Sequence, residues 1–511
     1  GQVSGKHTQL LALSGMQRGI LQDPENLSPM TAAKMAAQYG GLALIFLLAA
    51  IFVPKGSAAP VFIIPLALMA VYVLITRRTL ESLVVSGMMA ALLLYRSGIA
   101  SGYTDALMAA MASPDNVFTV LVMALMGGVV TLIEASGAVT AFKKLCDSKI
   151  RTARGAKLAM LGIAAVTAID DCLNMLCAAS ALRTVSDEKR IPRESGALML
   201  SFLPTTLCSF LPFSLWGIFV IGTLTAVTGG RSVMLFVSSI PFNFFSIAAV
   251  AAMALYAFGR LPLTKRLREA EERVNSGGAL YPPGSERYLQ QNETEVWGKI
   301  GNLLLPVAAL AVSSVAVRSI TGGRLVLDSA CGLVATLIFM FFLYCGQRLM
   351  SPEQFFRHLV SGIQSMALPI ILYLLTMCLA SMLNAEEMDE FFSGLVKAVA
   401  GASPLMPAAL FVIFTLLTMA LGSSWVMYVI GCPIAVRVAS LLGLSLTLCI
   451  GAVSAAGIAG EKLCVFTSDA LSVGIAIGCE PGAVLKTRLP YALSFAAVSA
   501  ALYLAAGLML S

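Results

Sequence analysis

Charged side chains are scarce in this sequence, which argues against an ordinary soluble domain. They make up 12% of its 511 residues, whereas soluble domains usually carry about 25%. Histidine is rarer still, because only His7 and His358 occur and both stand outside the apolar runs. The 11 cysteines lie mostly within apolar runs, where a free cysteine behaves as a small apolar side chain. They show no paired metal-ligand spacing, so a histidine- or cysteine-ligated metal and a haem are not expected.

Several enzyme motifs are missing as well. No Walker-type phosphate-binding loop occurs, so ATP-driven pumping by this chain is not expected. An intramembrane aspartyl protease needs aspartates on separate helices, one of them in a Gly-x-Gly-Asp setting, and this setting is not found. We therefore predict that the protein is not an enzyme and has no resident cofactor. No stretch resembles a cleaved signal peptide, and residues 1–34 are expected to form a polar cytoplasmic segment.

Apolar residues are abundant and make up 58% of the chain. At about 20 residues per span, this predicts an all-α polytopic membrane protein with about 11 crossings. The predicted crossings are Met35–Val53, Pro60–Ile75, Thr79–Tyr95, Val117–Phe142, Gly196–Val227, Val233–Phe258, Gly301–Ile320, Val326–Cys345, Leu359–Leu383, Ser445–Gly478 and Leu489–Leu510. The net charge of +7 lies mainly in the loops, so we interpret it as an orientation signal and expect a lipid bilayer, not nucleic acid, as partner.

One further apolar run, Leu158–Leu182, carries Asp170 and Asp171 at its middle. Basic residues flank it on both sides: Lys143, Lys144, Lys149, Arg151, Arg154 and Lys157 before it, and Arg183, Lys189, Arg190 and Arg193 after it. Because such loops mark the cytoplasmic side, the run is predicted to enter the bilayer and turn back as a re-entrant hairpin over 158–182. Each arm of about 12 residues reaches about 18 Å, to the bilayer midplane. Lipid-facing charges there would cost about 3 kcal/mol each, so both aspartates are expected to face protein or water.

The remaining charges orient the chain. Basic residues of the loop 259–299 and four others are predicted on the cytoplasmic side: Arg348, Arg357, Lys486 and Arg488. The acidic residues Glu386, Glu387, Asp389 and Glu390 are predicted outside. This gives a first transmembrane half over 35–258, a cytoplasmic linker over 259–299 and a second half over 300–511. The N-terminus is expected in the cytoplasm and the C-terminus in the periplasm or outside the cell, with the protein in the bacterial inner membrane.

The chain also resembles itself at a shift of about 250 residues. The stretch Ala168–Arg183 corresponds to Ala420–Arg437, and Ile240-Pro-Phe corresponds to Leu489-Pro-Tyr. A second re-entrant hairpin is therefore predicted over 404–437. An odd number of predicted crossings separates the two hairpins, so the second copy is inverted. Inverted repeats with interrupted helices are the architecture of secondary transporters, whose site lies near the midplane between the repeats.

The segment after each hairpin is too long for a simple span. In Gly196–Val227 the residues Pro204 and Pro212 mark either an ordinary kink or a real break, and we favour a break. In Ser445–Gly478 the break is predicted between Gly457 and Asp469. A helix broken inside the membrane leaves backbone groups that protein, water or an ion must satisfy. Free carbonyls suit Na+, and free N–H groups suit an anion.

The predicted binding site combines acids with neutral oxygen ligands. Asp170 and Asp171 are adjacent and should repel, which favours one shared proton. Glu461, Lys462 and Asp469 supply a second charged set, in which Lys462 either balances an acid structurally or takes part in transport. The predicted sodium ligands are Asp170, Asp171 and Asp469. The predicted neutral ligands are Asn174, Ser214, Ser423, Ser424, Thr467 and Ser468.

At these residues the chain resembles the NhaC-type sodium/proton antiporters of the ion transporter superfamily. The family's motifs are matched by Asp170-Asp171-Cys-Leu-Asn174 with Leu182-Arg183 and Asp187, Pro212-Phe-Ser214-Leu-Trp216-Gly217, Gly422-Ser-Ser424-Trp425 with Pro433-Ile-Ala, and Arg488-Leu-Pro-Tyr491-Ala-Leu, where the family has Gln-Leu-Pro-Tyr-Ala-Leu. The resemblance implies a secondary transporter that exchanges Na+ and H+ at a carboxylate site by alternating access, and it is compatible with a homodimer.

One block departs from the family pattern. Where the family has Gly-Asp-His-x-Ser-Pro-Ile-Ser-Asp-Thr-Thr, this chain has Gly460-Glu461-Lys462-Leu-Cys-Val-Phe-Thr467-Ser468-Asp469-Ala-Leu. Relatives of this family are thought to move organic anions or amino acids, and Lys462 would suit a carboxylate. The alternative prediction is therefore a sodium- or proton-coupled transporter of a small organic carboxylate or amino acid. A passive channel is not favoured, because the polar groups cluster at one predicted depth and do not line a pore.

Overall fold

The computed structural model describes residues 32–53, parts of 64–76, 78–138, 140–141, 150, 152–228, 232–289, 298–321, 325–383, 400–464 and 467–510. Within these residues the secondary structure is helical and includes no strand, which confirms the predicted all-α fold. Half of the predicted crossing Pro60–Ile75 and the acidic residues Glu386 to Glu390 lie outside the described residues.

Packing divides the chain into two compact units. The first comprises Gly1–Ser113 and Ile371–Ala398, and the second comprises Pro114–Ile370 and Val399–Ser511. Both predicted hairpins and both predicted broken helices belong to the second unit. The candidate site is therefore described within this one unit.

The first unit contains helices at two of the predicted crossings, Met35–Val53 and Thr79–Tyr95, and one helix that was not predicted. Its described helices include α2 (Ala32–Phe52), α4 (Thr79–Tyr95) and α5 (Ile99–Ala112). The bounds of α4 are those predicted, because its apolar run is long and continuous. Helix α5 was missed because its first half is polar. It packs closely on Tyr95, since a Cβ at Gly102 would lie 2.1 Å from the tyrosine ring.

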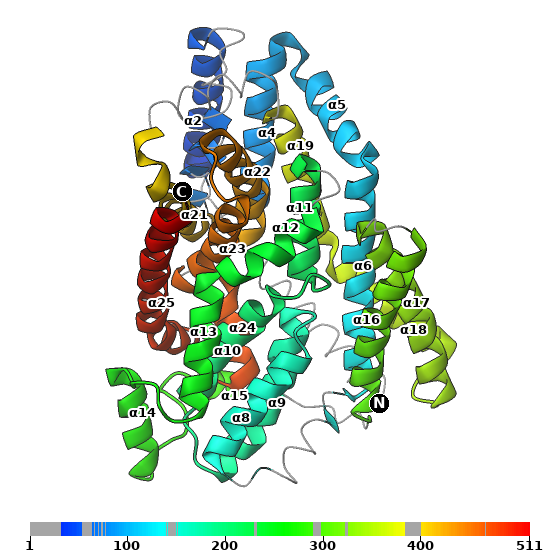
Figure 1. Ribbon diagram of the computed structural model, residues 1–511, viewed down its shortest axis with the longest axis vertical. Helices are drawn as coiled ribbons and strands as arrows, with labels where there is room; N and C mark the ends of the chain where they lie inside the picture. The colour runs from blue at the N-terminus through cyan, green and yellow to red at the C-terminus, as the bar shows by residue number, and fades with distance from the viewer. Residues whose placement is uncertain are drawn as a thin grey trace. The chain divides into compact units, whose positions relative to one another are not determined.

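The second unit contains two sets of helices in the same order. Each set has a helix hairpin, then a helix in two pieces, then a helix that carries an apolar-Pro-aromatic motif. The first set is α8 (Ala153–Val166), α9 (Asp171–Glu188), α10 (Arg193–Cys208), α11 (Leu215–Thr228), α12 (Ser232–Ser239) and α13 (Phe244–Ala257). The second is α21 (Met406–Leu421), α22 (Ser424–Leu442), α23 (Leu446–Leu463), α24 (Ser468–Ile477) and α25 (Pro481–Leu510). The hairpins α8–α9 and α21–α22 lie at opposite ends of this unit (Figure 1), as an inverted repeat predicts.

Both helix breaks are shorter than predicted. Helix α10 continues through Pro204 and ends at Cys208, so the break covers residues 209–214 and contains Pro212. Helix α23 continues through Gly457 and Gly460 and ends at Leu463. The glycines serve close packing, because a Cβ at Gly460 would lie 2.3 Å from the Cβ of Thr418 on α21. The prediction of a break beginning at Gly457 is therefore wrong.

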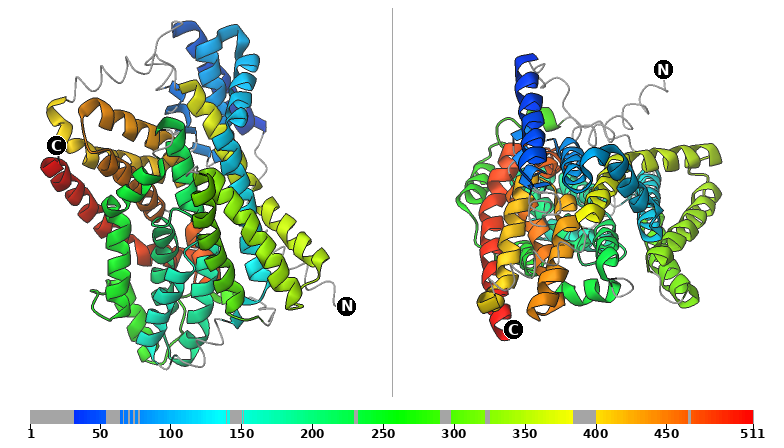
Figure 2. Two further views of the ribbon diagram at one scale, coloured as in Figure 1. Left: turned by 45° about the vertical axis from the view of Figure 1, so that its right-hand side comes forward. Right: turned by 90° about the horizontal axis from the view of Figure 1, so that it is seen from above.

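The third element differs between the two copies. The predicted single crossing Val233–Phe258 is bent by 51° between α12 and α13 at the 3-10 turn Ile240–Phe242. Asn243 begins the second piece by accepting a hydrogen bond from Ser246 N at 3.3 Å. Helix α25 instead runs unbroken through Pro490 and begins eight residues before the predicted crossing. It packs against α10, α13 and α23 (Figure 2).

A group of helices outside the repeats packs on α6 (Pro114–Ala135). It comprises α16 (Gly301–Thr321), α17 (Leu325–Gly346) and α18 (Pro352–Ser365), of which α17 and α18 contact α6. Helix α19 (Ala367–Leu383) follows α18 in the chain. Gly127 and Gly362 let α6 and α18 cross closely, since a Cβ at Gly362 would lie 2.3 Å from Gly127 O. The predicted crossing Leu359–Leu383 is bent by 41° between α18 and α19.

The predicted polar linker 259–299 is partly helical. It contains α14 (Lys265–Asn275) and the short α15 (Glu286–Leu289). Arg273 of α14 donates to both carboxylate oxygens of Glu194 at 2.9 Å. Arg190 donates to the carbonyls of Val274 and Gly278 at 3.2 and 3.0 Å. These contacts attach the linker to the loop between α9 and α10 and to the first turn of α10.

Several helices are long and apolar enough to span a bilayer. Among the described residues, four meet both criteria alone: Asn116–Ala135, Ser403–Leu421, Leu446–Leu463 and Pro481–Leu510. Bent helix pairs, including Ser232–Phe242 with Phe244–Ala257, also meet the criteria when taken together. The chain is a multi-pass membrane protein, and the number of about 11 crossings stays a prediction.

Candidate functional site

Asp170 lies at the tip of the first hairpin and caps a helix. Its Oδ1 accepts a hydrogen bond from Leu173 N at 2.9 Å, as an N-cap aspartate does at the start of α9. The side chain is buried, with 2% of its surface exposed. Asn174, in the first turn of α9, uses its amide to donate to Ala164 O of α8 at 2.7 Å. Both predicted ligands thus have structural partners that hold the two arms of the hairpin together.

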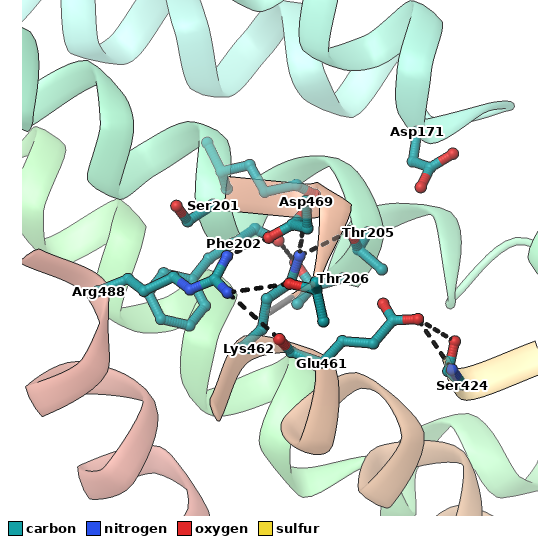
Figure 3. Close-up of polar contacts among 12 residues, drawn as sticks. Asp171, Ser201, Phe202, Thr205, Thr206, Ser424, Glu461, Lys462, Asp469 and Arg488 are labelled. Atoms are coloured by element: carbon teal, nitrogen blue, oxygen red, sulfur yellow. Dashed lines mark hydrogen bonds and ion pairs between the residues drawn. The ribbon is translucent and has the colours of Figure 1, made fainter. Parts of the chain in front are cut away.

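Asp171 is placed differently, although it is the next residue. It begins α9, is half-buried, and accepts one hydrogen bond from Cys172 N at 3.1 Å. Its carboxylate lies within electrostatic range of Lys462 and Asp469 and near the indole of Trp216. Figure 3 shows this side chain projecting from the hairpin on the side where the second charged set lies. The positive end of the α9 dipole favours a negative charge or a bound anion at this position.

The second hairpin meets the end of α23 through Glu461. Ser424 N donates to Glu461 Oε1 at 3.0 Å, and the hydroxyl of Ser424 donates to the same oxygen. Ser424 begins α22 and is buried, whereas its neighbour Ser423 is half-buried and makes no capping bond with its side chain. The N-terminus of α22 therefore holds the carboxylate of Glu461 much as a helix N-terminus holds an anion.

Lys462 and Asp469 form an ion pair across the break between α23 and α24. Lys462 Nζ lies 2.9 Å from Asp469 Oδ1 and donates to Thr205 Oγ1 of α10 at 3.1 Å. The lysine side chain is fully buried. Sequence reasoning predicted these two residues in one site, and the structure brings them together. A buried charge of this kind must be paired, because desolvation is otherwise too costly.

Arg488 completes this cluster, and it lies inside α25, not in a loop before the predicted crossing Leu489–Leu510. It has 0% of its surface exposed and donates from Nη1 to Asp469 Oδ2 (Figure 3). Lys486 and Arg488 resembled a basic loop because the last crossing was predicted to begin at Leu489, whereas α25 begins at Pro481. The available signal was the family motif, in which Gln stands where this chain has Arg488.

The other predicted neutral ligands occupy several environments. Ser214 holds the break between α10 and α11, since its hydroxyl lies 2.6 Å from Cys208 O and 2.8 Å from Leu211 O and accepts from Gly217 N. Thr467 Oγ1 accepts from Arg488 Nη2 at 3.3 Å. Ser468 begins α24, and its side chain lies outside the described residues.

Aromatic rings join the two halves of the site. Trp216 of α11 and Trp425 of α22 lie 5.2 Å apart between ring centroids, and Trp425 is 4.5 Å from Phe219. Tyr428 packs edge-on against Trp216 at 5.9 Å and donates from its hydroxyl to Ser454 O. The two tryptophans therefore pack α11 against α22.

Two carboxylates in the described part of the chain lie close enough together to share a cation. The candidate ligand atoms of Asp170, Asp171 and Cys172 all lie within 4.8 Å of one another. Carboxylate oxygens suit a hard cation such as Na+, whereas a thiol does not. Asp469, the third predicted sodium ligand, has one oxygen bonded to Lys462 and the other to Arg488. Glu134 of α6 lies within electrostatic range of Asp170.

Hairpins, broken helices and buried charges at their junctions define this fold as that of a secondary transporter. A curated protein of Haemophilus influenzae, described as uncharacterized, is 25% identical over 484 residues, which are 87% of this chain and 90% of its own. Two solved structures share the fold. The Alcanivorax borkumensis YdaH transporter aligns with a TM-score of 0.50 and 14% identity over 81% of this chain and 89% of its own.

The second structure is Neisseria gonorrhoeae MtrF, whose report describes a class of antimetabolite efflux pumps. It aligns with a TM-score of 0.51 and 11% identity over 91% of this chain and 97% of its own. Residues 207–508 match the Na+/H+ antiporter family. The chain belongs to this family, as its motifs predicted, and both the family and the solved relatives are transporters, not enzymes.

Proposed function

We propose that this protein exchanges Na+ for H+ across the bacterial inner membrane by alternating access, with Asp171 as the coupling acid. The observation that carries the proposal is the contrast among the acids of the site. Asp469 is bonded to two cations, Glu461 accepts two hydrogen bonds from Ser424, and Asp170 caps α9. Asp171 accepts a single backbone bond and is half-buried.

A carboxylate can couple two fluxes only if it releases one ion before it takes the other. Asp171 is free of a direct ion pair and lies at the start of a helix, so a proton and Na+ can alternate on its oxygens. Asp170 contributes a second carboxylate within the same ligand cluster, and we assign it the role of a supporting sodium ligand. Repulsion between the two adjacent charges favours occupancy by one proton or one cation at a time.

The second half of the site supplies a cluster of ion-paired charges opposite Asp171. Lys462 and Arg488 are both fully buried and neutralise Asp469, so this side of the site keeps its charge during the cycle. Lys462 also lies within electrostatic range of Asp171. Alternating access would then move the α8–α9 tip against this fixed cluster, in the way that one repeat rocks against another. We propose a mid-membrane position, a cytoplasmic N-terminus and an external C-terminus from the distribution of basic residues.

One observation favours a second candidate, the coupled transport of a small organic carboxylate. Lys462 has used two of its three donors, on Thr205 and Asp469. A carboxylate substrate beside Lys462 would take up the third donor. A homodimer is compatible with either function.

Proteoliposome flux tests the proposal. We expect a pulse of NaCl, but not of choline chloride, to drive proton movement reported by an internal pH dye, with no organic solute present. Asp171→Asn should abolish this signal, while the same change at Asp170, which keeps a capping oxygen, should reduce it less. Proton movement that requires an added carboxylate or amino acid would replace the antiporter with the second candidate.

A further inference from the structure

We propose that the guanidinium of Arg488 is a built-in cation that permanently occupies a cation site at the break between α23 and α24. The proposal goes beyond the exchange of ions at Asp171 and does not depend on it. It assigns a new role to the oxygen cage around Arg488 and predicts that removal of the arginine converts this cage into a sodium site.

The contacts of one nitrogen define the cage. Arg488 Nη2 donates to Cys464 O at 3.1 Å, to Glu461 O at 3.3 Å and to Thr467 Oγ1 at 3.3 Å. The neighbouring Nη1 donates to Asp469 Oδ2. Two backbone carbonyls, one hydroxyl and one carboxylate thus converge on the charged end of a single side chain. Oxygen atoms of these kinds are the ligands that hard cations take in proteins.

The backbone explains why these oxygens need a cation. The last carbonyls of a helix have no partner within the helix, and here α23 ends at Leu463 inside the protein. Glu461 O belongs to this last turn, and Cys464 O follows in the break. The negative end of the α23 dipole adds to their potential. In transporters with discontinuous helices, the carbonyls at such half-helix ends coordinate Na+ or H+.

An ion pair with Asp469 alone does not account for the arrangement. Lys462 already pairs with Asp469 Oδ1 at 2.9 Å, so this single carboxylate has two cationic partners. The second cation contributes chiefly by satisfying the carbonyls at the end of α23. Arg488 comes from α25, so the side chain also links that helix to both pieces of the broken helix.

The geometry also distinguishes this role from that of an anion-binding arginine. Both terminal nitrogens of Arg488 are engaged with protein oxygens, and the unpartnered Nε is fully buried. An arginine that receives a carboxylate would present its fork to the substrate. Here the fork is turned toward the cage. The second half of the site therefore carries a tethered charge that cannot dissociate, while the first half keeps an acid with no tethered cation.

The test uses purified full-length protein and measures thermal unfolding in NaCl, KCl or choline chloride at equal ionic strength. Asp171→Asn serves as the background, since it removes the proposed exchange site. In this background we expect Arg488→Gln to lower the Tm in choline chloride and in KCl. In saturating NaCl the Tm of the same variant should rise by on the order of 5 °C, because an ion that binds the folded state raises its stability. Arg488→Lys, which keeps a charge in the cage, should show no such gain.

The outcomes separate this inference from the proposed function. Sodium stabilisation of the wild type that disappears in Asp171→Asn concerns the exchange site alone. A sodium-specific gain in Asp171→Asn/Arg488→Gln supports the built-in cation, whatever the exchange assay gives. An equal Tm of this double variant in all three salts overturns the inference. Failure to recover folded Arg488→Gln protein even in NaCl also overturns it, because the vacated cage should then be filled by Na+.

Discussion

Lys462 Nζ lies 2.9 Å from Asp469 Oδ1, across the break of a single broken helix. The pair is not isolated, because Arg488 donates to the other oxygen of the same carboxylate and Thr205 accepts from the lysine. Three helices therefore meet at Asp469. This network fixes the geometry of the second half of the site and leaves Asp171 as the acid that faces it without a direct ion pair.

Replacing Lys462 by methionine should destabilise the protein and spare sodium/proton exchange. The change leaves Asp469 Oδ1 and Thr205 Oγ1 without their donor, at a cost of about 1–3 kcal/mol, and Arg488 limits the loss by keeping its own bond. Thermal unfolding and proteoliposome exchange measure the two effects. Lys486→Met, the same change at an exposed lysine of α25, is the control. An unshifted Tm together with loss of organic-solute uptake would instead make Lys462 a substrate ligand.

Replacing Asp171 by asparagine should abolish proton-coupled sodium flux while the fold survives. Asparagine keeps the size of the side chain and accepts from Cys172 N, but it carries no exchangeable proton. Asp170→Asn is the comparison variant, which should reduce the flux less and keep the helix cap, because asparagine caps helices as well as aspartate does. Exchange by detergent-purified, reconstituted protein is measured across a pH series. If both single variants transport normally with an unchanged pH profile, the aspartates are structural.

Replacing Ser424 by alanine should weaken the contact between the second hairpin and α23. The hydroxyl bond to Glu461 is lost and the backbone bond from Ser424 N remains, so the expected cost is about 1 kcal/mol. Ser423→Ala is the control, because Ser423 makes no capping bond with its side chain. Thermal unfolding of both variants compares them. A larger loss for Ser423→Ala would show that the cap of α22 is not what holds Glu461.

The re-entrant topology of the first hairpin can be tested by labelling. Ala153 and Lys189 lie at the outer ends of α8 and α9 and are both exposed. In a cysteine-free background, Ala153→Cys and Lys189→Cys should both react with an impermeant maleimide from the cytoplasmic side only. Labelling from opposite sides would turn the hairpin into an ordinary span and remove the argument for an inverted repeat.

Much of the helix pattern followed from local features of the chain. Long apolar runs placed α4, α16 and α17 within a residue or two of their observed bounds, because such runs are continuous helices in a bilayer protein. Basic residues on both sides of Asp170 predicted the first hairpin, and the internal similarity predicted the second. The bend at Ile240–Phe242 was missed, because the apolar-Pro-aromatic motif does not by itself predict a bend. The same motif at Pro490 lies within the unbroken helix α25.

The sequence by itself determined the class of protein, the order of hairpins and broken helices, and the acids that gather at their junctions. These depend on apolar length, on basic flanks and on charges too costly to leave in lipid. Only the tertiary structure decided which role each of the two adjacent aspartates has. Asp170 caps a helix and Asp171 faces the site, although they are neighbours, because adjacent residues on a helix point in different directions. Arg488 joined the site through contacts with a separate helix, and no local pattern encodes which buried partner a distant side chain will reach.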